Sequence, residues 1–92
     1  MKLNDLALYR KQALIGGAWC DADSGAAFDV ANPASGERLA RVPDMGAAET
    51  RRAIEAAEAA WPAWRNRTAK ERAAVLRKWF ELMLAHSDDL AF

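Results

Sequence analysis

Short apolar runs separated by glycine-containing turns fill the first half of the chain, and this pattern predicts β-strands. Residues 12–15 and 18–21 flank the pair Gly16 and Gly17. Two glycines between short apolar runs indicate a type I′ hairpin, because both central positions of that turn need positive φ. We therefore expect a hairpin here, and strands in general over about residues 12–42.

The remainder of this region contains one alternating segment and one strong turn signal. Around Phe28 and Val30, large apolar side chains alternate with small or charged ones, which is the period of a half-buried strand. Residues 32–36 read Asn-Pro-Ala-Ser-Gly, and they predict a turn because proline presets φ and glycine supplies a left-handed position. Extended structure is expected to resume at Glu37 and to end at Pro43.

Apolar residues recur at steps of three and four in the second half, which is the spacing of one helical face. One helix is predicted over about residues 47–60, with Pro62 ending or kinking it. A second is predicted over about 69–86, opened by a capping box in which the side chains of Thr68 and Glu71 satisfy free amides. The two stripes consist of Thr50, Ala53, Ile54, Ala57, Ala60, Trp61 and Trp64, and of Ala73, Leu76, Trp79, Phe80 and Met83 widened by Val75 and Leu82.

A further helix begins close to the last residue, truncated from about residue 88. Ser87 is expected as its N-cap, with Asp88 and Asp89 in its first turn. One helical turn is not stable alone, because nucleation costs more than that turn returns. The stripe over 69–86 is also wide enough to need more than one neighbour. We therefore expect the front part of a longer α/β protein, poorly folded as 92 residues alone.

Composition excludes several classes of protein. The 52% hydrophobic content and four tryptophans argue against disorder, while 13 basic and 13 acidic residues cancel and give no steering toward nucleic acid or anionic lipid. The longest apolar run, residues 13–20, is too short to span a membrane, and the N-terminus lacks the apolar core of a signal peptide. A single cysteine, Cys20, fits a reducing compartment. We expect a soluble cytoplasmic protein.

Few residues suggest chemistry. Cys20 has no cationic neighbour in sequence, so a small hydrophobe is favoured over a nucleophile. His86 lies near a predicted helix C-terminus, where capping carbonyls is favoured over acid–base catalysis. Gly16 and Gly17 lead into a strand rather than a helix, which favours a hairpin over a phosphate cradle. We therefore predict no catalytic, cofactor-binding or metal-binding residue in this chain.

The helical half carries a local excess of positive charge. Between Arg51 and Lys78 there are eight basic residues and three acidic ones. The tryptophans of this region lie on the apolar stripes and not among the arginines. A solvated helix face is therefore favoured over RNA binding.

Five short motifs, in order, resemble the amino-terminal end of the aldehyde dehydrogenase superfamily. Residues 14–19 (LIGGAW) are similar to its I-N-G-x-W hairpin, and residues 32–37 (NPASGE) to its N-P-A-[ST]-G-E turn. The alanine-rich segment 53–60, Trp64 and residues 68–77 (TAKERAAVLR) follow in the same order. The resemblance covers nearly the whole chain. It implies part of the Rossmann-like NAD(P)-binding domain of that fold, an N-terminal hairpin and strands with two to three helices.

Finer features resemble the bacterial succinate-semialdehyde group of this superfamily: residues 1–5 (MKLND), 42–47 (VPDMGA), 62–65 (PAWR) and 77–80 (RKWF). The resemblance implies oxidation of an aldehyde to an acid with NAD or NADP. In the family a cysteine thiolate attacks the aldehyde, hydride passes to the nicotinamide, and a glutamate activates water. None of those residues matches a position here, and Cys20 is not that cysteine.

The resemblance implies that this segment is structural and packs against the remainder of the chain, in an enzyme that is a homo-oligomer. Two alternatives remain open. In the first, the chain is a truncated, catalytically inactive piece that acts only by binding a partner or a complementary fragment. In the second, it is part of a dehydrogenase for another semialdehyde, such as glutarate semialdehyde.

Overall fold

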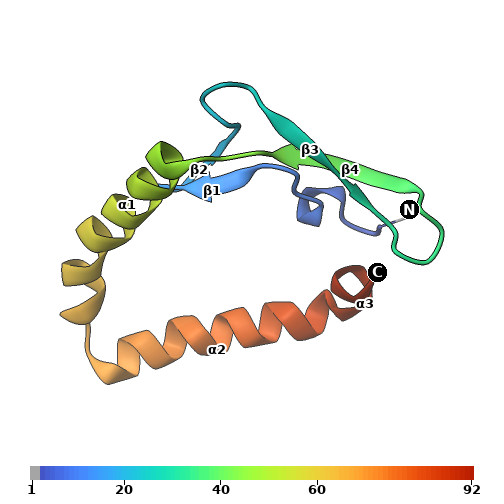
Figure 1. The fold of residues 1–92 in the computed structure, drawn as a ribbon. Coiled ribbons are helices and arrows are strands. Elements are labelled where there is room, and N and C mark those ends of the chain that lie inside the picture. The colour runs from blue at the N-terminus through green and yellow to red at the C-terminus, as the bar shows by residue number, and fades with distance from the viewer. Residues whose placement is uncertain (1–2) are drawn as a thin grey trace. The chain divides into compact units, whose positions relative to one another are not determined.

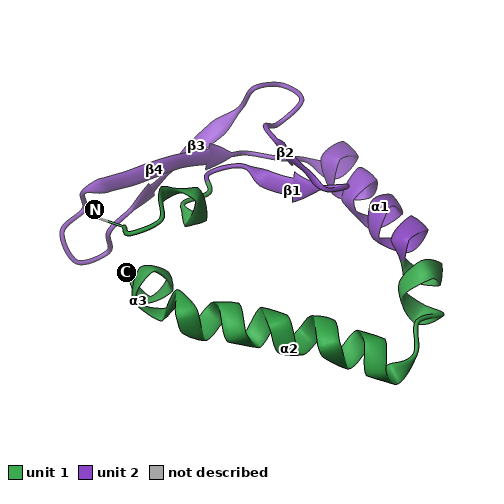
Figure 2. Cartoon of the chain, turned by 180° about the vertical axis from the view of Figure 1, so that it is seen from behind, with its two compact units in different colours: residues 1–10, 61–92 green, residues 11–60 purple. Residues whose placement is uncertain are grey.

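A computed structural model describes residues 3–92, so Met1 and Lys2 of the motif at 1–5 lie outside the described residues. The chain divides into two units, residues 11–60 and residues 1–10 with 61–92 (Figure 2). The elements, in chain order (Figure 1), are a turn of 3-10 helix η1 (Leu6–Leu8), strands β1 (Ala13–Ile15), β2 (Ala18–Cys20), β3 (Ala27–Ala31) and β4 (Arg38–Pro43), and helices α1 (Ala47–Arg65), α2 (Ala69–Ala85) and α3 (Ser87–Ala91).

The predicted hairpin is confirmed. Strands β1 and β2 pair antiparallel, with Leu14 opposite Trp19. Gly16 and Gly17 between them have φ of +59° and +79°, the positive values that a type I′ turn requires. A Cβ atom added to Gly16 would lie 3.9 Å from the Cβ of Ala56, so this turn sits against the α1 helix of the same unit.

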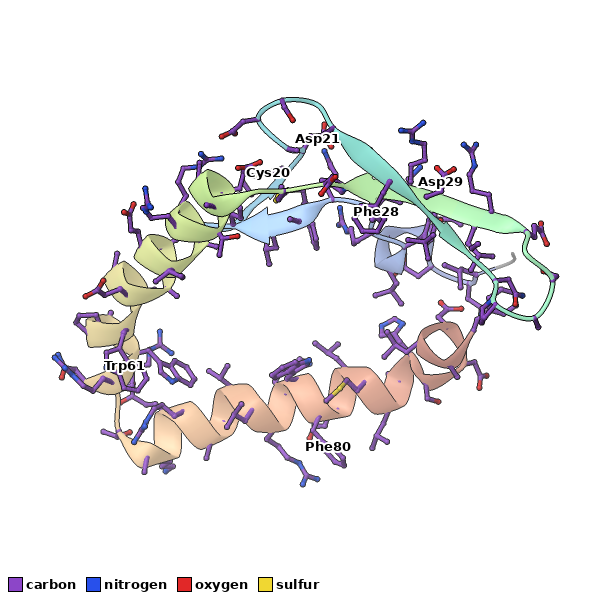
Figure 3. The ribbon with its side chains drawn as sticks, viewed as in Figure 1. Cys20, Asp21, Phe28, Asp29, Trp61 and Phe80 are labelled. Carbon is purple, nitrogen blue, oxygen red and sulfur yellow. The ribbon has the colours of Figure 1, made fainter. Side chains whose placement is uncertain are left out.

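Strands β3 and β4 form a second antiparallel ladder, with a register irregularity at Val30/Ala31. The turn joining them forms as predicted, because the Asn32 side chain accepts from Ala34 N at 2.9 Å and Gly36 has φ of +73°. Phe28 and Asp29 lie on opposite faces of β3 (Figure 3). The expectation of a half-buried strand is wrong for the described chain, since Phe28 is 51% exposed.

Helix α1 continues past the predicted end. The sequence places that end near Ala60 because of Pro62, whereas the helix runs through Pro62 to Arg65. Proline removes one backbone donor but leaves its own carbonyl free to accept, and Asn66 N donates to the Pro62 carbonyl at 3.0 Å. The alanine-rich turns before Pro62 have high helix propensity, so one missing hydrogen bond does not end the helix.

The start of α2 is predicted correctly, and the start of α3 is displaced by one residue. The Thr68 hydroxyl accepts from Glu71 N at 3.1 Å, as the capping box predicts. The other half of the predicted box is wrong, because the Glu71 carboxylate accepts from the Thr68 hydroxyl at 3.1 Å and not from a free amide. Ser87 is not the N-cap of α3, because His86 holds that position without a side-chain hydrogen bond. The reason is that α2 ends at Ala85, so His86 closes one helix and its carbonyl already accepts from Leu90 N.

Burial is sparse throughout the part of the chain that the structure describes. Within residues 3–92 only Ala22 and Glu49 are buried, and no large apolar side chain is. Trp61 and Trp79 are 51% and 61% exposed. The apolar stripes of α1 and α2 are therefore formed as predicted but are not covered by an apolar core.

Candidate functional site

The densest polar cluster lies where β2 leads into the following loop, against the first turns of α1. Arg52 donates two hydrogen bonds to the Asp23 carboxylate, from Nη1 to Oδ2 at 2.8 Å and from Nη2 to Oδ1 at 2.7 Å. The buried Glu49 carboxylate accepts from the Asp23 backbone N–H at 3.3 Å. These bonds fasten the loop to a helix 26 to 29 residues away in sequence.

The pair shifts the protonation equilibria of both partners. The hydrogen bond from Arg52, assisted by the charge of its guanidinium, lowers the pKa of Asp23 below its ordinary value of 3.8 and outweighs the opposing effect of desolvation. The hydrogen bond and the charge of Asp23 raise the pKa of Arg52, with smaller contributions from Glu49 and Cys20. The cluster is thus a neutralised ion pair held at the surface.

Cys20 sits at the edge of this cluster, next to Asp21 at the end of β2 (Figure 3). Its thiol donates to the carbonyl of Ala18 at 3.4 Å, while Asp21 accepts from the Gln12 amide at 3.0 Å. The fold does bring a cation near Cys20, namely Arg52, which no local sequence signal indicates. Because Asp23 already engages both terminal nitrogens of that guanidinium, the arrangement favours a small structural side chain over an activated nucleophile.

His86 occupies the junction of α2 and α3. Its backbone N–H closes the C-terminus of α2 on the carbonyls of Leu82 and Leu84. His86 also lines an apolar depression in the same unit, together with Leu8, Trp79, Leu82, Met83 and Leu90. The capping expected of His86 is therefore made by its backbone. Cys20 belongs to one unit of the chain and His86 to the other.

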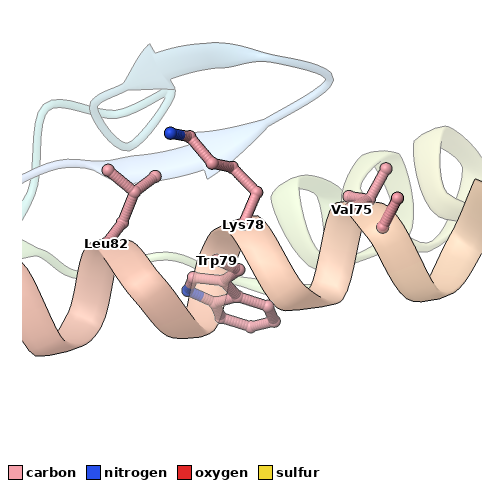
Figure 4. A pocket seen from close by; sticks show the side chains of 5 residues that line it. Val75, Lys78, Trp79 and Leu82 are labelled. Carbon is pink, nitrogen blue, oxygen red and sulfur yellow. The ribbon is translucent and has the colours of Figure 1, made fainter.

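Two open grooves are lined almost wholly by apolar side chains. One, of about 520 Å³, lies along α2 between Val75, Trp79 and Leu82, and the Lys78 amine at its rim points away from the Trp79 ring (Figure 4). The other lies in the unit of residues 11–60, between the β1–β2 turn and the alanines of α1. Ligand pockets combine apolar walls with several convergent polar groups. These grooves have the walls alone, which suits protein packing.

The described residues do not present a metal or dinucleotide site. Among residues 3–92, no three His, Cys, Asp or Glu side chains gather to hold a metal ion. Gly16 and Gly17 join one strand to the next, whereas a dinucleotide cradle needs a glycine turn that leads into a helix N-terminus. That this segment binds no NAD or NADP stays a prediction.

Comparison with known proteins identifies the class. The model of the aldehyde dehydrogenase family matches residues 19–92, and the chain therefore belongs to that family. It is 64% identical over 91 residues to the NADP⁺-dependent succinate-semialdehyde dehydrogenase GabD of Escherichia coli K12, and 62% identical over 91 residues to a glutarate-semialdehyde dehydrogenase of Pseudomonas putida KT2440. Each alignment covers 99% of this chain and 19% of the relative.

Solved structures agree with this assignment. The succinate-semialdehyde dehydrogenase of Burkholderia pseudomallei matches with a TM-score of 0.95 and 63% identity, over 99% of this chain and 19% of that one. The resemblance read from the sequence and the mixed α/β class are thus confirmed. The chain spans about a fifth of the length of these relatives. Of the helices described, none combines the length and hydrophobicity needed to cross a membrane.

Proposed function

We propose that these residues form the N-terminal segment of an NAD(P)-dependent aldehyde dehydrogenase that oxidises succinate semialdehyde to succinate. The observation that carries this proposal is the 64% identity over 91 residues to the NADP⁺-dependent E. coli enzyme. In the reaction the aldehyde carbon gains an oxygen from water and its hydride reduces NAD(P)⁺, and two protons are released, one of them by ionisation of the new carboxylic acid.

The role of the segment itself is structural. Its helices carry exposed apolar stripes and its grooves lack convergent polar groups, which supports packing against the remainder of the polypeptide. The catalytic and cofactor-binding residues lie outside residues 1–92. Neither Cys20 nor His86 takes part in hydride transfer or acylation.

We extend the proposal to the setting of the enzyme, which we take to be a cytoplasmic homo-oligomer without nucleic-acid or membrane partners. The formal net charge of zero supports the absence of polyanionic partners. The single free thiol of Cys20 suits a reducing compartment.

The first test is the intact mass of the purified native gene product under denaturing conditions. We expect a chain about five times the 10.1 kDa of these residues, because they cover 19% of their relatives. That protein should then reduce NAD(P)⁺ when given succinate semialdehyde, as followed by the absorbance of the reduced nicotinamide. A folded, full-length protein without this activity would contradict the proposal.

Glutarate semialdehyde is the second candidate substrate. The relatives that act on the two semialdehydes are 64% and 62% identical to this chain over 91 residues, a difference of about two residues. The identities over this segment therefore do not discriminate between the two substrates. Comparing kcat/KM for the two semialdehydes decides between them, and at least a tenfold preference for succinate semialdehyde is expected.

The exposed apolar stripes also support one non-enzymatic function. In this alternative, a chain of 92 residues acts only by binding a partner or a complementary fragment. A native mass near 10.1 kDa favours this alternative. It requires that mixing the chain with the remainder of a homologous dehydrogenase gives a stable complex. The absence of any complex would exclude it.

A further inference from the structure

We draw no further inference here: the strongest candidate, the apolar depression that Leu8, Trp79 and Leu90 line at the junction of α2 and α3, is an unpartnered apolar surface, and nothing among the described residues shows what covers it.

Discussion

At the scale of single residues, three carboxylates hold segments that are remote in sequence. Asp23 pins the loop after β2 to α1 through Arg52, and the buried Glu49 accepts from the backbone of the same loop. Asp89 accepts from the backbone N–H groups of Asn4 at 2.8 Å and Asp5 at 2.9 Å. Each carboxylate accepts hydrogen bonds that backbone or guanidinium donors would otherwise make to water, and it thereby restrains a loop or the N-terminal segment.

The Asp23–Arg52 pair should make its unit sensitive to acid. The pKa of Asp23 is lowered on folding, so its contribution to stability is complete above its ordinary pKa of 3.8 and is lost as the pH falls through the lower folded value. Arg52→Met should abolish this part of the pH dependence, whereas its exposed neighbour variant Arg51→Met should retain it. Urea midpoints of the full-length enzyme between pH 2 and 6 measure the difference. Identical profiles for both variants would contradict the prediction.

The Asp89 contact should control the N-terminal segment. In Asp89→Ala the amides of Asn4 and Asp5 lose their acceptors, and their hydrogen exchange should accelerate about tenfold or more, as measured by NMR or mass spectrometry. Asp88→Ala is the control, because Asp88 shares the first turn of α3 and makes neither bond. Equal exchange in the two variants would show that Asp89 does not hold this segment.

At the scale of elements, local signals predict the start of a helix correctly where several residues separate it from the preceding helix. Thr68 caps α2 as its sequence predicts, since only two residues beyond the last turn of α1 precede it and neither competes for the cap. Between α2 and α3 a single residue remains, His86, and it closes the first helix and opens the second. Ser87 is consequently drawn into the helix and loses the capping role that its residue type predicts.

This difference predicts opposite outcomes for two similar variants. Thr68→Ala removes the hydroxyl that accepts from Glu71 N, and it should lower the free energy of unfolding of the intact protein by about 1 kcal/mol. Ser87→Ala should change it by less than about 0.5 kcal/mol, because alanine is a good helix former and Ser87, the first residue of α3, is not its N-cap. Urea denaturation compares them. A larger loss of unfolding free energy in Ser87→Ala than in Thr68→Ala would contradict this prediction and indicate that Ser87 caps α3.

At the scale of the whole molecule, the shortage of buried apolar side chains stands out. Within residues 3–92, four strands form two separate two-stranded ladders, and the large apolar residues of α2 remain substantially exposed. A two-stranded ladder is marginal without a covering layer, and exposed stripes gain free energy only when another surface covers them. The stability of this segment therefore comes mainly from the rest of the proposed enzyme.

The isolated 92-residue chain should accordingly unfold without a sharp transition. Differential scanning calorimetry should show a broad, weak endotherm, and its amide NMR signals should be poorly dispersed. The full-length enzyme, scanned under the same conditions, serves as the control and should unfold cooperatively. A sharp transition of the 92 residues with well-dispersed amides would show that they form a stable domain alone.

Much of the local structure follows from the sequence alone, because its causes are local. Positive φ at Gly16 and Gly17, the Asn32 turn and the Thr68 cap each depend on residues within a few positions of one another. The order of such motifs also suffices to assign the aldehyde dehydrogenase family.

Tertiary structure decided the remainder, since it depends on groups far apart in the chain. The partners of Asp23 and Asp89 lie 29 and 85 residues away, and no local pattern encodes such distances. Helix α1 continues past Pro62, because the alanine-rich turns before it have high helix propensity and only one backbone hydrogen bond is lost. Arg72 reads as an ordinary surface cation in the sequence, whereas the structure buries its Nε atom without a hydrogen-bond partner among the described residues.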